Sequence, residues 1–198
     1  MIYIVRHGQT ALNKSRALQG RSDNPLNDAG RQQAREAGEW IKERGITFDR
    51  VYSSPLVRAV ETAALVSGFD DKDIVRDERL IEMDYGPYEG ADLRDPSPEL
   101  KEFFSDFVHN PAPRGMESLQ SVVDRQADFF TWLEGTDLSE NILVSTHAIA
   151  MKGALEFLTP ESKGSYWKKF IGNCAIYVTD YLDGKFSVPY EIEIGKEE

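Results

Sequence analysis

The chain begins with Met1-Ile2-Tyr3-Ile4-Val5-Arg6-His7-Gly8. Ile2 to Val5 form an unbroken apolar run, which is typical of a short strand buried on both faces of a sheet. The run stops at Arg6, and His7 and Gly8 follow at once. Open α/β sheets bind ligands beyond the carboxyl ends of their strands, so this stretch predicts a reactive group at such an edge.

Further apolar runs follow along the chain, and helical patterns separate them. We predict strands at 50–53, 74–77, 141–145, 174–180 and 186–192. Helices are predicted at 27–44, 55–67, 98–109, 117–134 and 148–158, and the second would begin with Ser54 as N-cap and Pro55 in its first turn. Residues 8–28 and 80–97 read as loops, and residues 195–198 read as a polar tail. Alternating strands and helices predict an α/β fold of three layers, α/β/α, with a mostly parallel central sheet.

Composition narrows the classes of partner. The 198 residues suit a single domain, and their net charge of −11 would repel nucleic acids and anionic membrane surfaces. Cys174 is the only cysteine, which excludes an intrachain disulfide and a cysteine-based zinc site. The sequence has neither a signal-peptide pattern nor an apolar run near the roughly 18 residues of a membrane span. We therefore predict a cytoplasmic protein, and a homodimer stays open.

Cationic side chains follow three of the predicted strands. Arg6 and His7 follow the first strand, Arg58 lies shortly after the second, and His147 follows the strand at 141–145. Four such groups repel one another unless a dianion joins them, and guanidinium groups match phosphate oxygens well. A neutral imidazole held through its other ring nitrogen could then attack phosphorus. The pattern predicts phosphoryl chemistry, although Arg58 could instead pair with Glu61 on its own helix.

Phosphoryl transfer also needs a proton donor for the leaving oxygen. The loop at 80–90 carries three carboxylates, Glu82, Asp84 and Glu89. The residues alone do not choose among them.

Several ordered blocks resemble the histidine phosphatase, or phosphoglycerate mutase-like, superfamily. The matching blocks are 5–13, 19–34, 53–63, 80–90, 115–118, 144–147 and 173–175. The resemblance implies the fold of that superfamily, a phosphohistidine on His7, and Glu82 as the general acid and later base. It also implies that Arg6, Arg58 and His147 hold the phosphoryl group, that Asn13, Gln19 and Gly20 line the pocket, and that neither metal nor organic cofactor takes part.

Two departures from the family pattern bear on the reaction. Ala148-Ile149 stands where family members often carry Gly-Gly. In the cofactor-dependent mutases of this family, the acid loop resembles Glu-Arg-His-Tyr-Gly. Here Met83-Asp84 takes the place of Arg-His, so two basic groups that would meet a phosphoglycerate carboxylate are missing. We therefore predict a phosphomonoesterase acting on a small phosphorylated metabolite. A mutase remains the alternative, and a non-catalytic binding protein or a metal hydrolase is less favoured.

The aromatic runs at 103–107 and 129–133 have near-helical spacing. Core packing is the favoured interpretation, and a lid or substrate groove is the alternative. Residues from about 80 to 135 could form a cap over the site.

Overall fold

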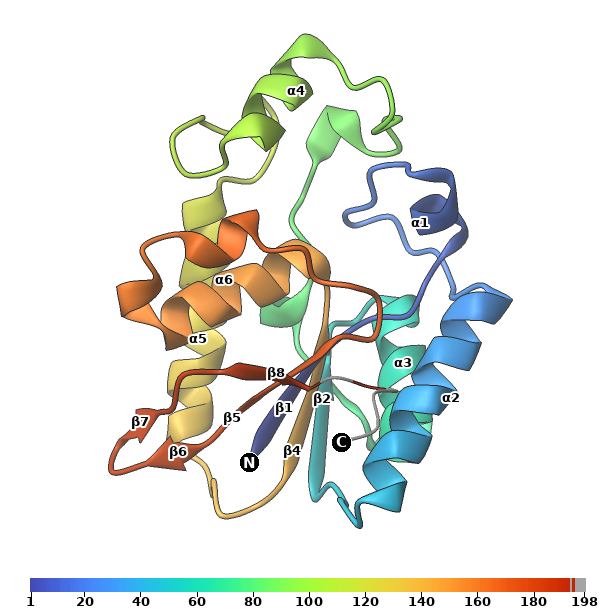
Figure 1. The fold of residues 1–198 in the computed structure, drawn as a ribbon, viewed down its shortest axis with the longest axis vertical. Helices are drawn as coiled ribbons and strands as arrows, with labels where there is room; N and C mark the ends of the chain where they lie inside the picture. The colour runs from blue at the N-terminus through green and yellow to red at the C-terminus, as the bar shows by residue number, and fades with distance from the viewer. Residues whose placement is uncertain (193, 195–198) are drawn as a thin grey trace.

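The computed structural model describes residues 1–192 and 194, so the predicted tail at 195–198 lies outside the described residues. Within them, six strands form a central sheet in the order β3-β2-β4-β1-β5-β8 (Figure 1). These strands are β1 (Ile2–Arg6), β2 (Arg50–Ser53), β3 (Val75–Arg76), β4 (Ile142–Thr146), β5 (Ile176–Thr179) and β8 (Tyr190–Ile192). The first four pair in parallel, and β5 runs antiparallel to both β1 and β8.

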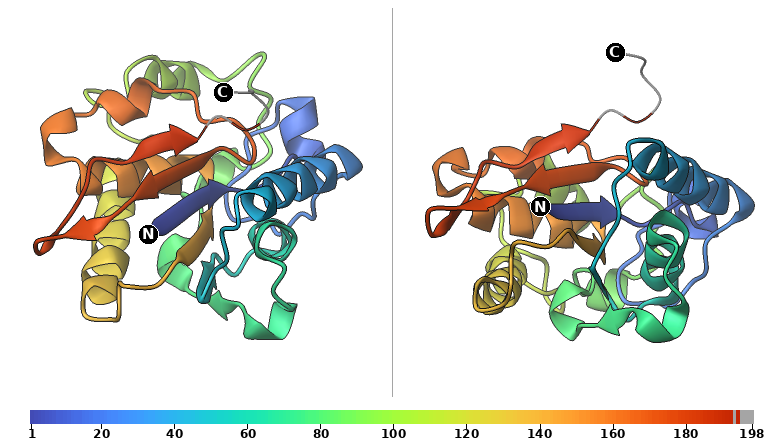
Figure 2. Two further views of the ribbon diagram at one scale, coloured as in Figure 1. Left: turned by 60° about the horizontal axis from the view of Figure 1, so that its bottom comes forward. Right: turned by 90° about the horizontal axis from the view of Figure 1, so that it is seen from below.

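Helices cover both faces of this sheet (Figures 1 and 2). They are α2 (Asp28–Glu43) and α3 (Val57–Ser67) on one face, and α5 (Leu119–Glu134) and α6 (Ala148–Leu158) on the other. The strand residues alternate between the two layers: Ile2 and Ile4 pack with α5 and α6, whereas Tyr3 and Val5 pack with α2 and α3. The predicted three-layer α/β/α class is confirmed.

Two short helices lie towards the carboxyl end of the parallel strands, α1 (Ala11–Ser15) and α4 (Pro98–Ser105) (Figure 1). The prediction of a continuous loop at 8–28 is wrong at α1. The side chain of Thr10 accepts a hydrogen bond from the Asn13 amide, and the Asn13 side chain accepts one from the Thr10 amide. This reciprocal capping stabilises a turn that lacks any apolar period.

The predicted start of α3 is also wrong, because Ser54 does not cap the helix. Its hydroxyl oxygen lies 2.7 Å from Nε2 of His147, and α3 begins three residues later at Val57. Asp23, which lies in a loop distant in sequence, caps the helix instead: its Oδ1 accepts a hydrogen bond from the Val57 amide at 2.7 Å. A tertiary contact has overridden the local signal.

Two other predicted elements are too long. Helix α4 ends at Ser105 instead of residue 109, because the Asp106 carboxylate accepts the Val108 amide and turns the chain. The strand predicted at 186–192 is split: Lys185–Phe186 (β7) pairs with Tyr181–Leu182 (β6) in a separate hairpin, and only β8 joins the sheet.

Helix α4 is anchored by apolar contacts away from the sheet. Leu100 and Phe103 on its inner face are buried in a third cluster with Met83, Val122 and Trp167. This cluster connects the segment around α4 to α5 and α6. Segments distant in sequence thereby meet beyond the end of the sheet, where a cavity lies.

Candidate active site

His7 lies directly after β1, and its surroundings fix its ring. Its Nδ1 lies 2.7 Å from the carbonyl oxygen of Gly8, which can only accept, so Nδ1 carries the proton and Nε2 keeps a free lone pair. The His7 amide donates to the carbonyl of Thr146 at 3.0 Å, which ties the residue to β4. Burial, together with the charges of Arg6 and Arg58, holds the pKa of His7 well below its ordinary value. The ring is therefore neutral at physiological pH.

Gly8 lets the chain pass very close to α2. A Cβ atom at this position would lie 2.4 Å from the carbonyl oxygen of Gly30, a distance that no side chain tolerates. The Gly8 amide donates to Oγ1 of Thr62 at 3.0 Å. The segment that carries His7 is thus clamped between two helices.

His147 is fully buried behind His7, and the two ring centroids are 5.1 Å apart. The Leu56 amide donates to the Ser54 hydroxyl oxygen, so that hydroxyl can donate its own hydrogen to Nε2 of His147. The proton of the neutral ring then belongs to Nδ1. Burial and the neighbouring Arg58 hold the pKa of His147 well below its ordinary value.

Arg58 and Arg6 bring two guanidinium groups to the same place. Arg58 is fully buried and donates to the carbonyl oxygens of Ser22 and Gly20 at 2.7 and 2.5 Å. It does not pair with Glu61, whose carboxylate accepts from Arg31 at 2.6 Å. Burial lowers the pKa of Arg58 to about 10, so the group stays charged at neutral pH. Arg6 donates to the carbonyl of Ile171 at 2.5 Å.

Several buried side-chain nitrogen atoms of this region have no hydrogen-bond partner among the described residues. They are Nε of Arg6, Nε2 of Gln19, Nε of Arg58 and Nδ1 of His147. A buried donor without a partner is costly, and each of these four can donate to an anion. All four belong to residues that the sequence assigned to a phosphoryl site.

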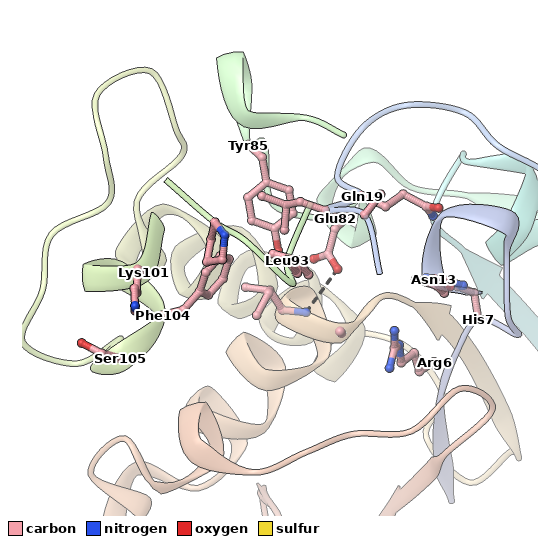
Figure 3. A pocket seen from close by; sticks show the side chains of 15 residues that line it. Arg6, His7, Asn13, Gln19, Glu82, Tyr85, Leu93, Lys101, Phe104 and Ser105 are labelled. Atoms are coloured by element: carbon pink, nitrogen blue, oxygen red, sulfur yellow. Dashed lines mark hydrogen bonds between the residues drawn. The ribbon is translucent and has the colours of Figure 1, made fainter. Parts of the chain in front are cut away.

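The three carboxylates of the loop at 80–90 have different surroundings. Glu82 is buried, and its carboxylate accepts from the amides of Met83, Ile149 and Ala150 at 2.9, 3.2 and 3.0 Å, at the N-terminus of α6 (Figure 3). Asp84 pairs with Arg21 at 3.6 Å, and Glu89 accepts from the Gly20 amide at 2.9 and 3.0 Å. Of the three, Glu82 alone lines the cavity.

This cavity encloses about 580 Å³ and has two distinct ends (Figure 3). The inner end is lined by the polar residues Arg6, His7, Asn13, Gln19 and Glu82. The part of the lining contributed by residues 93–105 is called the outer end, and it consists of Leu93, Pro96, Lys101, Phe104 and Ser105. The wall between them consists of Ala17, Leu18, Tyr85, Ala148 and Ile149.

Three of the predicted site residues do not line the cavity. Arg58 and His147 lie behind its inner end, beside Arg6 and His7. Gly20 contributes through its backbone, since its carbonyl accepts from Arg58, and a Cβ there would lie 2.5 Å from the carbonyl oxygen of Met83.

For the aromatic run at 103–107, core packing was favoured and a substrate groove was the alternative. Phe103 is buried in the core, whereas Phe104 is half-buried, packs against the same cluster and also lines the cavity. Helix α4 carries one buried and one half-buried aromatic side by side, Phe103 and Phe104, and no pattern in the sequence separates core from pocket there. Tyr85 was missed, and burial beside Glu82 and Glu89 raises its pKa above the ordinary value, which keeps its hydroxyl protonated.

Two further observations concern the described residues alone. No group of three or more His, Cys, Asp or Glu side chains capable of holding a metal ion occurs at positions 1–192 or 194. No helix in the same part of the chain is long and apolar enough to cross a membrane.

Residues 2–190 match the family model of the histidine phosphatase superfamily (branch 1). The chain belongs to this superfamily. It is 33% identical to a 2,3-bisphosphoglycerate-dependent phosphoglycerate mutase from Parvibaculum lavamentivorans over 160 residues, which cover 77% of this histidine phosphatase and 76% of the relative. The predictions of the family, of the fold and of a phosphatase are confirmed.

Solved structures of the superfamily superpose along nearly the whole chain. YhfR of Bacillus stearothermophilus is 28% identical and superposes with a TM-score of 0.84 over 94% of each chain. A phosphoserine phosphatase variant from Entamoeba histolytica, solved in complex with phosphoserine, is 27% identical. It superposes with a TM-score of 0.79 over 97% of this chain and 94% of its own.

Proposed function

We propose that this phosphomonoesterase hydrolyses a small phosphorylated metabolite through a phosphohistidine on His7. The observation that carries the proposal is the hydrogen bond from Nδ1 of His7 to the Gly8 carbonyl, because it leaves Nε2 as a neutral nucleophile. Arg6 and Arg58 beside it supply two positive charges for a phosphoryl dianion. The phosphoserine complex of the Entamoeba histolytica relative supports a phosphomonoester as substrate.

The reaction has two displacement steps at phosphorus. In the first, Nε2 of His7 forms a bond to phosphorus, the ester P–O bond breaks, and Glu82 gives its proton to the departing alcohol oxygen. In the second, the Glu82 carboxylate takes a proton from water as the water oxygen attacks phosphorus. The N–P bond then breaks, and inorganic phosphate and neutral His7 are regenerated.

Binding of the phosphoryl group is assigned to the unpartnered donors. Arg6, Arg58, Gln19 and His147 each present a buried nitrogen atom that an anion could satisfy. Asn13 lines the same inner end, and Gly20 supports Arg58 through its carbonyl. The charge of the transferred group is spread over three oxygens, so several fixed donors stabilise it better than one. We also propose that residues from about 80 to 135 act as a cap on this single catalytic domain.

A mutase is the second candidate, because a relative that is 33% identical carries that name. Two residues of the acid loop argue for hydrolysis instead. Met83 is fully buried among apolar side chains, and Asp84 is paired with Arg21. Neither adds a positive charge to the cavity, so among its lining residues a phosphoglycerate carboxylate would meet only the exposed Lys101 besides Arg6 at the phosphoryl end.

Trapping of the phosphoenzyme tests the proposal. Phosphomonoesters labelled at phosphorus are mixed with the enzyme, and the protein is denatured in alkali, which preserves phosphohistidine. We expect labelled protein and free phosphate from the wild type, and neither from His7→Ala. His109→Ala is the matched control, since His109 is 75% exposed and lies beside Asp106. Phosphate release that survives His7→Ala would refute the proposal.

Two additional arms address the alternatives. Product analysis with 3-phosphoglycerate, with and without a bisphosphorylated primer, separates hydrolysis from mutase activity. A chelator added to the same assay should leave the rate unchanged, whereas loss of activity would indicate a metal hydrolase. Cytoplasmic location and homodimerisation stay predictions.

A further inference from the structure

The outer end of the cavity differs chemically from the inner end. Its wall is built mostly from apolar side chains, including Leu93, Pro96 and Phe104, and Ile149 and Leu18 continue that surface inward. Leu93 is 40% exposed although it faces this cavity. A large apolar side chain in such a position gains stability when an apolar ligand covers it.

Charge is distributed unevenly over the cavity lining. Besides Arg6 and His7, the only other basic residue among the lining side chains is Lys101, and Glu82 is the one acidic residue. The Glu82 carboxylate already accepts three backbone amides. Within the described residues, a substrate ammonium group would therefore meet two cations and no free carboxylate, which is unfavourable.

The size of the cavity points the same way. About 580 Å³ falls within the roughly 300–1,000 Å³ of pockets that enclose drug-sized ligands. A phosphoryl group bound at His7 leaves most of the apolar wall uncovered. The remaining space suits a leaving group much larger than a three-carbon acid.

From these features we infer that the leaving alcohol carries an apolar, aryl-sized body without a positive charge, and that Phe104 and Leu93 bind that body. The inference rests on the proposed function, because it places the phosphoryl group at His7. It assigns to residues 93–105 the selection of the substrate.

Three phosphate esters of primary alcohols test the inference without large differences in leaving-group chemistry. They are 2-phenylethyl phosphate, ethyl phosphate and 2-aminoethyl phosphate, and kcat/KM is measured for each. We expect 2-phenylethyl phosphate to exceed ethyl phosphate about tenfold or more, since burial of a phenyl group corresponds to at least one factor of ten. The 2-aminoethyl ester should be the poorest of the three.

Variants of Phe104 test whether this side chain causes the preference for the phenylethyl ester. Phe104→Ala should lower the ratio of kcat/KM for the phenylethyl and ethyl esters at least threefold, and Phe104→Leu should retain most of it. Phe170→Ala removes an aromatic ring that is 85% exposed and does not line the cavity, so it should leave the ratio unchanged. A thermal unfolding curve checks that each variant is folded.

The outcomes separate the two proposals. If all three esters release phosphate at similar kcat/KM, or if the 2-aminoethyl ester is preferred, the inference about the outer end is overturned and the proposed function stands. If Phe104→Ala leaves the ratio intact in a folded protein, the assignment to Phe104 is wrong. Release of phosphate from none of the esters overturns the proposed function itself.

Discussion

The two ends of the cavity are held in place by different forces. At the inner end, His7 is fixed by hydrogen bonds to backbone groups that belong to or adjoin the parallel strands. At the outer end, Phe104 is presented by α4, which is attached through apolar contacts of Leu100 and Phe103. Directional bonds define a geometry within tenths of an ångström, whereas apolar contacts tolerate changes of shape. The proposed reaction and the proposed choice of substrate therefore rest on separate parts of the chain.

The largest effect should come from removing the proton donor at the inner end. Glu82→Gln should lower kcat for 2-phenylethyl phosphate by about 10²–10⁴, the usual contribution of a general acid. With 4-nitrophenyl phosphate, single-turnover release of 4-nitrophenol should be slowed much less, because that leaving group departs without a proton. Asp84→Asn is the matched control from the same loop, and its carboxylate pairs with Arg21 outside the cavity. Equal losses for both esters in this first step, measured in a single turnover, would contradict the role of Glu82 as proton donor.

Removing a buried charge at the inner end should have the next largest effect. Arg58→Met keeps an unbranched stem without the guanidinium group and should lower kcat/KM by about 10²–10³, as expected for one donor to the transferring group. Arg31→Met, on the half-exposed partner of Glu61, should stay within about twofold of the wild type. A folded Arg58→Met enzyme with near-normal kcat/KM would remove Arg58 from the phosphoryl site.

The buried histidines of the inner end should also make stability depend on pH. Their pKa values are lowered in the folded state, so the unfolded chain binds more protons once the pH falls below about 6.5. Above that pH, these histidines do not change the free energy of unfolding. Below it, each histidine lowers the free energy of unfolding by about 1.4 kcal/mol per pH unit.

Urea unfolding between pH 7.5 and 5 measures this slope. His147→Gln should have a shallower slope than the wild type, because one of the two groups no longer titrates. Parallel curves for the two proteins would contradict the low pKa of His147. No equivalent dependence is expected from the outer end, which contributes no histidine to the cavity.

The smallest effect should come from the charge at the outer end. Lys101 is exposed, so Lys101→Met should lower kcat/KM for 3-phosphoglycerate about two- to fivefold, the range of a solvated ion pair. The difference should fade as salt is added, because screening acts on exposed charges. An effect beyond tenfold that persists at high salt would indicate a dedicated carboxylate site and would favour the mutase alternative.

The difference between the inner and the outer end of the cavity explains which site residues could be predicted from the sequence. Arg6 and His7 follow a strand directly, so the apolar run before them places both at the edge of the sheet. Glu82 could not be chosen over Asp84 from the residues alone, because its contact with the α6 amides joins segments more than 60 positions apart. Phe104 could not be assigned to the core or to the cavity from the sequence, because that assignment depends on how α4 packs against α5 and α6.

Local signals failed at two places where specific side-chain hydrogen bonds decided the structure. Ser54-Pro55 has the composition of a helix start, but the Ser54 hydroxyl contacts His147 instead. Thr10 and Asn13 cap each other in a stretch whose polarity suggested a loop. In both cases, one or two side-chain hydrogen bonds outweighed a propensity of a few tenths of a kcal/mol.

The position of Glu82 at the start of α6 has a consequence for the timing of the reaction. In the proposed reaction, once Glu82 has given up its proton, the amides of Ile149 and Ala150 and the dipole of α6 stabilise the negative charge that remains. The N-terminus of α6 thus stabilises the Glu82 carboxylate between the two half-reactions. It keeps the carboxylate ready, without rearrangement, until water arrives to return the proton.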